Sequence, residues 1–286
     1  SVTSFTRSPA VGGAKPATHD EVIGDSSRLD DCREVVAAVK PTAIFVAISA
    51  LTPRSATEAN GDMVFMEVRS LSNILQAAHE NGVTSIGFCS SGGAVYGSSP
   101  GFHKEIDPCA PPSLYGKMKL QCESLLTTIC DNWSIDGFAL RIGNPYGPGQ
   151  SPHGLHGVIA KFAYQILKHQ PIKIIGSPES EKDYVYIDDV SRAALAAFDG
   201  RARGIYNIAS AKGTAIATLI EKIVARCGVR PNVEMGQLGS VEVSSFLLDV
   251  SEARRDFGWE PVTDLETGID RTVAWITETQ LDETVG

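Results

Sequence analysis

The sequence lacks the features that define several large classes of protein. Its 286 residues contain no apolar run of membrane-spanning length and no apolar leader at the N-terminus, so we expect neither a membrane protein nor a signal peptide. Its six cysteines form no CxxC pair, which favours reduced thiols in a cytoplasmic protein. Positive charge is also scarce, and the net charge of −9 argues against nucleic acid or an anionic membrane as the main partner.

The sequence also lacks the patterns of two common kinds of active site. Gly-x-Ser-x-Gly, the turn that carries the nucleophile of many serine hydrolases, does not occur. Of the six histidines, His153 and His156 share a loop, but no third ligand follows at a spacing that suits zinc. We therefore expect no metal site and no Ser-His-Asp triad.

What the sequence does contain is an alternation of short apolar runs with segments of helical periodicity. We expect strands at residues 1–7, 21–25, 42–50, 84–90, 137–141, 171–176 and 204–208. We expect helices at residues 31–40, 63–81, 115–131, 153–170, 190–198 and 214–227. Apolar strands that alternate with helices are typical of a parallel sheet covered on both faces. The pattern predicts an α/β fold with a doubly wound parallel sheet.

Tyr115 and Lys119 are the most informative pair of polar residues. They are four apart, so in the helix expected at residues 115–131 both side chains lie on one face. There an ammonium can hold a phenol near its ionised form, which makes a proton donor and acceptor. Ser90 and Ser91 end an apolar strand and can place a hydroxyl beside the same substrate oxygen. Taken alone, the pair is more typical of a solvated helix face than of a catalytic site.

Four motifs in register identify a family resemblance. They are Ser-Ser-Gly-Gly-Ala-Val-Tyr-Gly from residue 90, Tyr-Gly-Lys-Met-Lys from residue 115, Leu-Arg-Ile-Gly-Asn-Pro-Tyr-Gly from residue 140 and Asp-Tyr-Val-Tyr-Ile-Asp-Asp-Val from residue 183. Their order resembles the extended short-chain dehydrogenases/reductases, and within them the NAD-dependent epimerase/dehydratase (UDP-galactose 4-epimerase-like) branch. The resemblance extends to about residue 275. It implies a Rossmann-type dinucleotide-binding lobe at residues 1–150, to which 183–210 return, and a mainly substrate-binding lobe at 151–286.

The resemblance assigns the catalytic roles. It makes Tyr115 the proton carrier and Lys119 the residue that lowers its pKa and binds the nicotinamide ribose. The family's hydroxyl-bearing position falls on Gly92, so Ser91 is our candidate for that role and Ser90 the second choice. The Asp-Glu pair that 4,6-dehydratases carry after this position is replaced by Gly93-Ala94, which argues against dehydration.

Cofactor binding is the part of the family pattern that the sequence follows least. No Gly-x-x-Gly-x-x-Gly turn, whose amides hold the pyrophosphate, occurs, so we expect the chain to lack the first βα unit of the fold. Arg7 follows the strand that selects the cofactor and favours NADP over NAD, unless it stacks on or points past the adenine; both cofactors remain open. The resemblance places further cofactor contacts at Asp25, Ala47, Ser49, Ser90 and Pro145.

Substrate binding also departs from the family pattern. Ser91, Gly92 and Asn144 match substrate-contacting positions, and Lys182 replaces the usual arginine, giving a point charge without a bidentate fork. No arginine occurs at residues 239–245, so the clamp for a nucleotide diphosphate is weakened. We interpret Asp183, Asp188 and Asp189 as structural, bonding the backbone and capping the helix expected at residues 190–198.

These features favour an NAD(P)-dependent epimerase of a sugar or nucleotide sugar, an oxidoreductase-type isomerase that works by transient hydride transfer. One alternative is an NADPH-dependent reductase of a keto-sugar or other carbonyl. Another is a non-catalytic sensor or scaffold that keeps the fold. The resemblance further implies a homodimer formed through the helices expected at residues 63–81 and 115–131.

Overall fold

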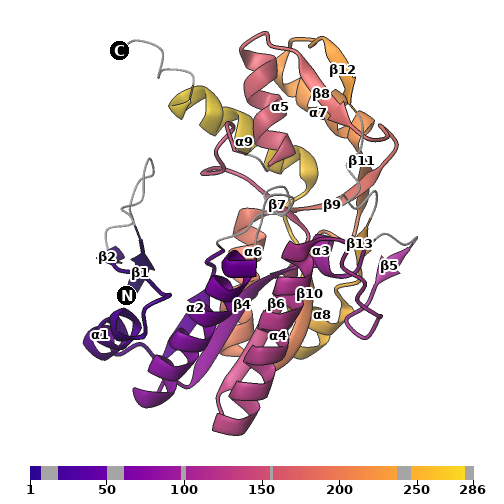
Figure 1. Cartoon of the computed structure of the whole chain (residues 1–286). Coiled ribbons are helices and arrows are strands. Elements are labelled where there is room, and N and C mark those ends of the chain that lie inside the picture. Colours follow the sequence, from indigo (N-terminus) through magenta and orange to yellow (C-terminus); the bar gives the residue numbers. More distant parts are fainter. Residues whose placement is uncertain (8–18, 50–60, 98–100, 155–156, 237–245, 281–286) are drawn as a thin grey trace.

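The computed structural model of the protein describes residues 1–7, 19–49, 61–97, 101–154, 157–236 and 246–280. These residues form a sheet lobe and a smaller second lobe, which is drawn above the first in Figure 1. His156 and the stretch at residues 239–245, named above, lie outside the described residues. The architecture confirms the predicted α/β fold.

A parallel sheet forms the centre of the first lobe. Its strands run in the order β10-β6-β4-β3, namely Gly204–Ile208, Asp136–Ile142, Ser85–Ser91 and Ala43–Val46. A second parallel pair joins β1 (Val2–Thr6) to β2 (His19–Ile23). Every residue of β6 is buried, as expected for a strand covered on both faces. The predicted strand at residues 42–50 is shorter than expected and ends at Val46.

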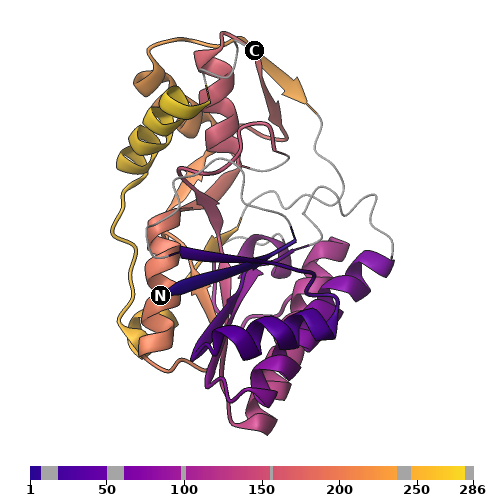
Figure 2. The same ribbon diagram turned by 90° about the vertical axis from the view of Figure 1, so that its left-hand side faces the viewer.

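Helices cover both faces of this sheet, as Figures 1 and 2 show. One face carries α1 (Leu29–Val39), α2 (Gly61–Glu80) and α4 (Leu114–Trp133), which pack side by side. The other carries α6 (Ile187–Asp199) and α8 (Ser251–Phe257). Strand β10 and helix α6 therefore return the chain to the first lobe after it has left. Leu71, Ile86 and Leu126 centre the core on the α2 side, and Phe138 and Leu140 the core on the α6 side.

The second lobe has a core of its own. It packs α5 (Val158–Leu167), α7 (Ile216–Cys227) and α9 (Leu265–Thr279) against β8 (Ile172–Ile175), which pairs with β12 (Val233–Gly236). The predicted helix at 153–170 begins only at Val158, because Gly157 precedes it at φ 88°, outside helical geometry. Sequence periodicity missed α9, which begins where the Asp264 side chain accepts a hydrogen bond from Thr267 N.

Short elements join the two lobes. Strands β7 (Asn144–Tyr146), β9 (Glu181–Tyr186) and β11 (Gly213–Ala215) form one sheet, and β5 (Phe102–His103) pairs with β13 (Leu247–Leu248). Helix α3 (Gly92–Val95) follows β4 directly. These pieces lie at the carboxyl ends of β4 and β6, where ligands of open α/β sheets bind.

Two expectations from the sequence concern the environment of the protein. Among the described residues, no helix is both long enough and apolar enough to span a membrane. All six cysteines are described, and none forms a disulfide.

Candidate functional site

The candidate site is built where α3 meets the first turn of α4. Helix α4 begins after Ser113, whose Oγ accepts a hydrogen bond from Gly116 N at 3.1 Å. A Cβ on Gly116 would collide with the carbonyl oxygen of Ala94, so glycine is what allows α3 to touch α4 here. This close approach brings the end of β4 next to Tyr115.

Lys119 lies one turn further along α4, with its charge enclosed by protein. The side chain is buried, and Nζ donates to the Cys89 carbonyl oxygen at 3.2 Å and to Glu67 Oε1 at 3.1 Å. Nζ is also 5.6 Å from the centroid of the Tyr115 ring. The helical spacing of Tyr115 and Lys119 thus places the ammonium beside the phenol, as predicted.

Ser91 is the serine that reaches Tyr115. The two side chains share a hydrogen bond, which favours the ionised form of the phenol. Ser90 does not serve as the second choice that the sequence suggested, because its buried hydroxyl donates to Glu123 Oε1 in the core. Gly92 is buried as well, and a Cβ there would come within 2.5 Å of Leu248 Cδ1. A hydroxyl-bearing side chain at residue 92 would therefore require the Leu248 side chain to move.

The protonation of the pair follows from burial and nearby charge. Burial raises the pKa of Tyr115, and this outweighs the lowering by the Lys119 charge and by the hydrogen bond with Ser91. Burial lowers the pKa of Lys119, but the charges on Tyr115 and Glu67 outweigh burial and leave it raised. Lys119 acts on Tyr115 in the expected direction, yet the phenol stays protonated at neutral pH in this environment.

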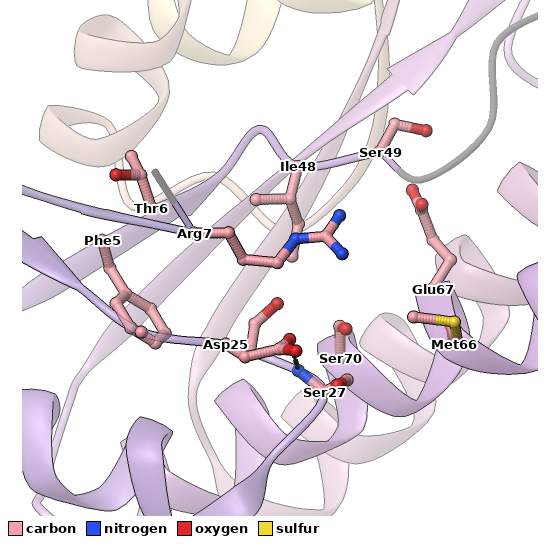
Figure 3. A pocket seen from close by; sticks show the side chains of 12 residues that line it. Phe5, Thr6, Arg7, Asp25, Ser27, Ile48, Ser49, Met66, Glu67 and Ser70 are labelled. Atoms are coloured by element: carbon pink, nitrogen blue, oxygen red, sulfur yellow. Dashed lines mark hydrogen bonds between the residues drawn. The ribbon is translucent and has the colours of Figure 1, made fainter. Parts of the chain in front are cut away.

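A cavity lies between the first two strands and α2, and Glu67, the partner of Lys119, is among the residues that line it. It encloses about 130 Å³ and is partly open to solvent. Figure 3 shows the Arg7 side chain extending over it from the end of β1 toward Ser49 and Glu67. The lining residues, which come from β1, the turn after β2, the end of β3 and α2, are Phe5, Thr6, Arg7, Gly24, Asp25, Ser26, Ser27, Ile48, Ser49, Met66, Glu67 and Ser70.

Asp25 is held at the floor of this cavity by a turn. Its Oδ1 accepts a hydrogen bond from Ser27 N at 2.9 Å, drawn as a dashed line in Figure 3. The Asp25 amide in turn donates to Asp31 Oδ2 at 2.9 Å. The hydrogen bonds from Ser27 and the charge of Arg7 lower the pKa of Asp25. Its carboxylate is therefore ionised and already oriented at neutral pH.

The other predicted contacts are more dispersed. Ala47 and Pro145 are exposed, Ala47 just past the end of β3 and Pro145 on β7. Asn144 donates from Nδ2 to the Asp183 carbonyl oxygen at 3.0 Å, so one of its two N–H groups ties β7 to β9. Lys182 is half-buried, with Nζ 5.5 Å from the centroid of the Phe246 ring. None of these four residues lines this cavity.

Two of the three aspartates near residue 185 bind the backbone, as predicted. Asp183 accepts from Ser210 N at 2.7 Å and from Ser210 Oγ at 2.6 Å. Asp189 accepts from Val262 N at 3.2 Å and Thr263 N at 2.9 Å. The predicted capping role is wrong, because α6 begins without a side-chain cap and both aspartates reach distant segments. Asp188 is exposed, 3.9 Å from Arg271 Nη1.

Sequence reasoning missed two buried carboxylates. Glu67 pairs with Lys119, and Glu123 pairs with Arg141, whose Nη2 lies 2.8 Å from Glu123 Oε2. Arg141 also donates to Tyr96 Oη at 2.8 Å. The one available signal was a charged residue on the apolar face of each helical pattern, since Glu67 and Glu123 both fall among buried positions.

Comparisons with known sequences agree on a family. Residues 2–209 match the NAD dependent epimerase/dehydratase family. The dTDP-4-dehydro-6-deoxyglucose reductase of Escherichia coli is 35% identical over 196 residues, 68% of this chain and 62% of the relative. The UDP-glucose 4-epimerase of Mycolicibacterium smegmatis is 32% identical over 249 residues, 85% of this chain and 78% of the relative. The chain thus spans less than two thirds of the Escherichia coli relative.

Solved structures share the fold over nearly the whole chain. The UDP-glucose 4-epimerase of Thermus thermophilus in complex with NAD has a TM-score of 0.87 at 26% identity, covering 94% of this chain and 88% of that one. The UDP-glucose 4-epimerase of Thermotoga maritima with UDP-glucose has a TM-score of 0.91 at 25% identity, covering 96% of this chain and 90% of that one.

Proposed function

Because the chain belongs to the NAD-dependent epimerase/dehydratase family, we propose that it is a nicotinamide-dependent epimerase of a nucleotide sugar. The observation that carries the proposal is the contact of Tyr115 with Ser91 on one side and Lys119 on the other. The relatives that are UDP-glucose 4-epimerases supply the substrate class.

The polar groups that line the cavity suit the adenosine end of a dinucleotide. Asp25 and Ser27 offer an acceptor and a hydroxyl at its floor, and the Arg7 guanidinium lies at its edge for a phosphate. Glu67 lines the cavity and contacts Lys119. Lys119 in turn lies beside Tyr115, the proposed proton carrier. When bound, the nicotinamide ring accepts and returns a hydride. The sequence contains no glycine-rich turn that could bind the pyrophosphate, so we assign no residue of this chain to that group.

Residues of this chain transfer one proton to and from the substrate during the reaction. In its phenolate form, Tyr115 Oη takes the proton from a sugar hydroxyl while hydride leaves the same carbon, and gives it back when hydride returns to the opposite face. Ser91 binds the same sugar oxygen through its hydroxyl, and the Lys119 ammonium stabilises the phenolate form. Lys182 and backbone amides of the second lobe would hold the diphosphate as a point charge and dipoles.

The test is to incubate the purified protein with UDP-galactose and NAD and to follow UDP-glucose by NMR. We expect interconversion without net reduction of NAD, and a loss of at least about 100-fold in kcat for Tyr115→Phe, because the phenol is the proton carrier. Tyr164→Phe, in α5 of the second lobe, is the matched control and should keep full activity. An equally active Tyr115→Phe variant would refute the assignment.

A reductase of a keto-sugar is the second candidate. Two observations favour it: the similarity to the Escherichia coli dTDP-4-dehydro-6-deoxyglucose reductase, and the raised pKa of Tyr115, which keeps the phenol ready to donate its proton to a carbonyl oxygen. With dTDP-4-dehydro-6-deoxyglucose, this activity would consume one NADPH or NADH for each product formed. Dinucleotide binding without turnover of either substrate would instead indicate a sensor.

The proposal includes a homodimer through α2 and α4. These helices lie side by side on one face of the sheet, and the Phe65 side chain on α2 is 72% exposed. An interface on this face would remove the Phe65 ring from water. Light scattering of the eluted protein should therefore give twice the mass of the chain, and a monomer mass would contradict this part of the proposal.

A further inference from the structure

Glu67 is a buried carboxylate that the proposed reaction has not yet used. Its side chain is 3% exposed, and its Oε1 lies 3.1 Å from Lys119 Nζ. Taking a carboxylate and an ammonium out of water carries a large desolvation penalty, which the attraction between the two charges offsets only when their geometry is good. The net contribution of this ion pair to folding stability is therefore expected to be small. We interpret the pair as serving the chemistry of Lys119.

The other buried carboxylate of α2 and α4 gives a useful contrast. Glu123 accepts hydrogen bonds from Arg141 and Ser90 in the interior and does not line the cavity. Glu67 does line the cavity, on the side toward which the Arg7 side chain extends in Figure 3. Of these two carboxylates, Glu67 is the one placed between the proposed cofactor space and the proton carrier.

Lys119 stands between two groups that its charge affects. On one side is the Glu67 carboxylate, and on the other is the Tyr115 ring, 5.6 Å from Nζ to the ring centroid. An ammonium alone favours the phenolate, whereas an ammonium paired with a carboxylate presents far less net charge to the phenol. The partner of Lys119 therefore decides how strongly Lys119 can act on Tyr115.

Resting on the second candidate function above, the reductase of a keto-sugar, we propose that Glu67 is a positioning residue that holds the Lys119 ammonium beside Tyr115 and offsets its charge, so that Tyr115 keeps its proton until substrate is bound. The carboxylate also fixes the lysine side chain, whose second N–H donates to the Cys89 carbonyl oxygen. Tyr115 then enters the reaction as an acid. It passes its proton to a carbonyl oxygen as hydride reaches the carbonyl carbon, and the products are an alcohol, the oxidised cofactor and a phenolate.

The charges around Tyr115 agree with this role. The titratable groups that face it are Lys119 of α4, Glu67 of α2 and Cys89 of β4. Glu67 is among the groups that raise the pKa of Tyr115, after burial, while Lys119 lowers it. Burial raises the pKa of Cys89 too, so this thiol is neutral at pH 7 and does not replace the Glu67 charge.

The test is a spectroscopic titration that needs neither cofactor nor substrate. Phenolate absorbance is recorded against pH, and the curve of Tyr115→Phe is subtracted to isolate Tyr115. We expect a midpoint above about 10, the ordinary tyrosine value, and a shift to lower pH in Glu67→Gln. Glu67→Asp keeps the charge and should restore most of the original midpoint. Glu80→Gln, an exposed carboxylate of the same helix, is the matched control and should leave it unchanged.

Two results would overturn the proposal. One is an identical midpoint in Glu67→Gln, which would make Glu67 a purely structural partner. The other is a midpoint below that of an ordinary tyrosine in the unaltered protein, and this arm holds even if Glu67→Gln does not fold. Because the titration is independent of turnover, a protein that shows the shift but does not act on sugars would refute the proposed function and leave this inference standing.

Discussion

Several side chains at the site are already held in place by hydrogen bonds within the protein. Lys119 donates to Glu67 and to Cys89, Ser91 shares a hydrogen bond with Tyr115, and Asp25 is fixed by Ser27. Such preorganisation lowers the cost of orienting groups when a reaction begins. Arg7 differs from these residues, because its side chain is exposed at the mouth of the cavity.

Arg7 allows a prediction about cofactor choice. A guanidinium at this edge can pair with the 2′-phosphate of NADP, which NAD lacks. We expect Arg7→Ala to weaken NADP binding about tenfold, roughly 1.4 kcal/mol, and to leave NAD binding within about twofold. Calorimetric titration with both cofactors would measure this. Arg28→Ala removes another exposed arginine near Asp25 and serves as the control. Equal weakening of both cofactors would mean that Arg7 contacts the adenine instead.

At the scale of elements, the site depends on the short pieces that join the lobes. Helix α3 is in close contact with β13, since the Leu248 side chain occupies the space next to Gly92. The same strand β13 is tied to β9 through Asp183, whose Oδ2 accepts from Leu248 N at 3.5 Å. Movement of β13 would therefore disturb both Gly92 and Asp183.

Asp183 gives a prediction about pH. Burial raises its pKa to about 6, against hydrogen bonds from Ser210, Leu248 and Ala211 that lower it. A raised pKa in the folded state means that folding takes up a proton between about pH 4 and 6. The stability that this group contributes is therefore largest below about pH 4 and is lost as pH rises through about 6. Urea unfolding at about pH 4.5 and about pH 7 should show this dependence and should not show it in Asp183→Asn.

The matched control for Asp183 is Asp249, which lies between β13 and α8 in the same joining region. Hydrogen bonds from Ser251 lower the pKa of Asp249, so its contribution has the opposite sign and is lost as pH falls. Asp249→Asn should therefore remove stability at about pH 7 and little at about pH 3. If Asp183→Asn and Asp249→Asn changed the pH dependence in the same direction, the assignment for Asp183 would be wrong.

At the scale of the whole molecule, the segment between α8 and α9 leads the chain from the sheet lobe to the second lobe. Asp189 of α6 holds this segment through the amides of Val262 and Thr263, and its carbonyl oxygen accepts from Trp259 Nε1 at 2.9 Å. The Asp189 side chain is 1% exposed. One buried carboxylate thus anchors the start of the path to α9.

We expect Asp189→Ala to lower the free energy of unfolding by about 2–4 kcal/mol, because several donors to a buried charge lose their partner together. Asp188→Ala is a close control, since it removes the neighbouring carboxylate, which is exposed and lies 3.9 Å from Arg271 Nη1. The cost of that change should stay below about 1 kcal/mol, as for other exposed ion pairs. Equilibrium unfolding in urea would compare the two. Similar costs for both variants would contradict an anchoring role for Asp189.

Much of the fold followed from the sequence. The strand at residues 84–90 and the helix at 115–131 are present as β4 and α4 within a few residues, because apolar periodicity reports which side of an element is buried. The helix α9 was missed, and the strand after residue 42 was predicted too long at its end. Element ends depend on caps and tertiary contacts that periodicity does not record.

The sequence by itself determined the family, the doubly wound sheet and the pairing of Tyr115 with Lys119, because a spacing of four residues sets a common helix face whatever the surroundings. Only the tertiary structure decided that Ser91 faces Tyr115 while Ser90 faces Glu123, and that Glu67 meets a lysine 52 residues later. These contacts depend on how β4, α2 and α4 pack together. Burial within this packing is the largest influence on the pKa of Tyr115, and the charges of Lys119 and Glu67 add to it with opposite signs.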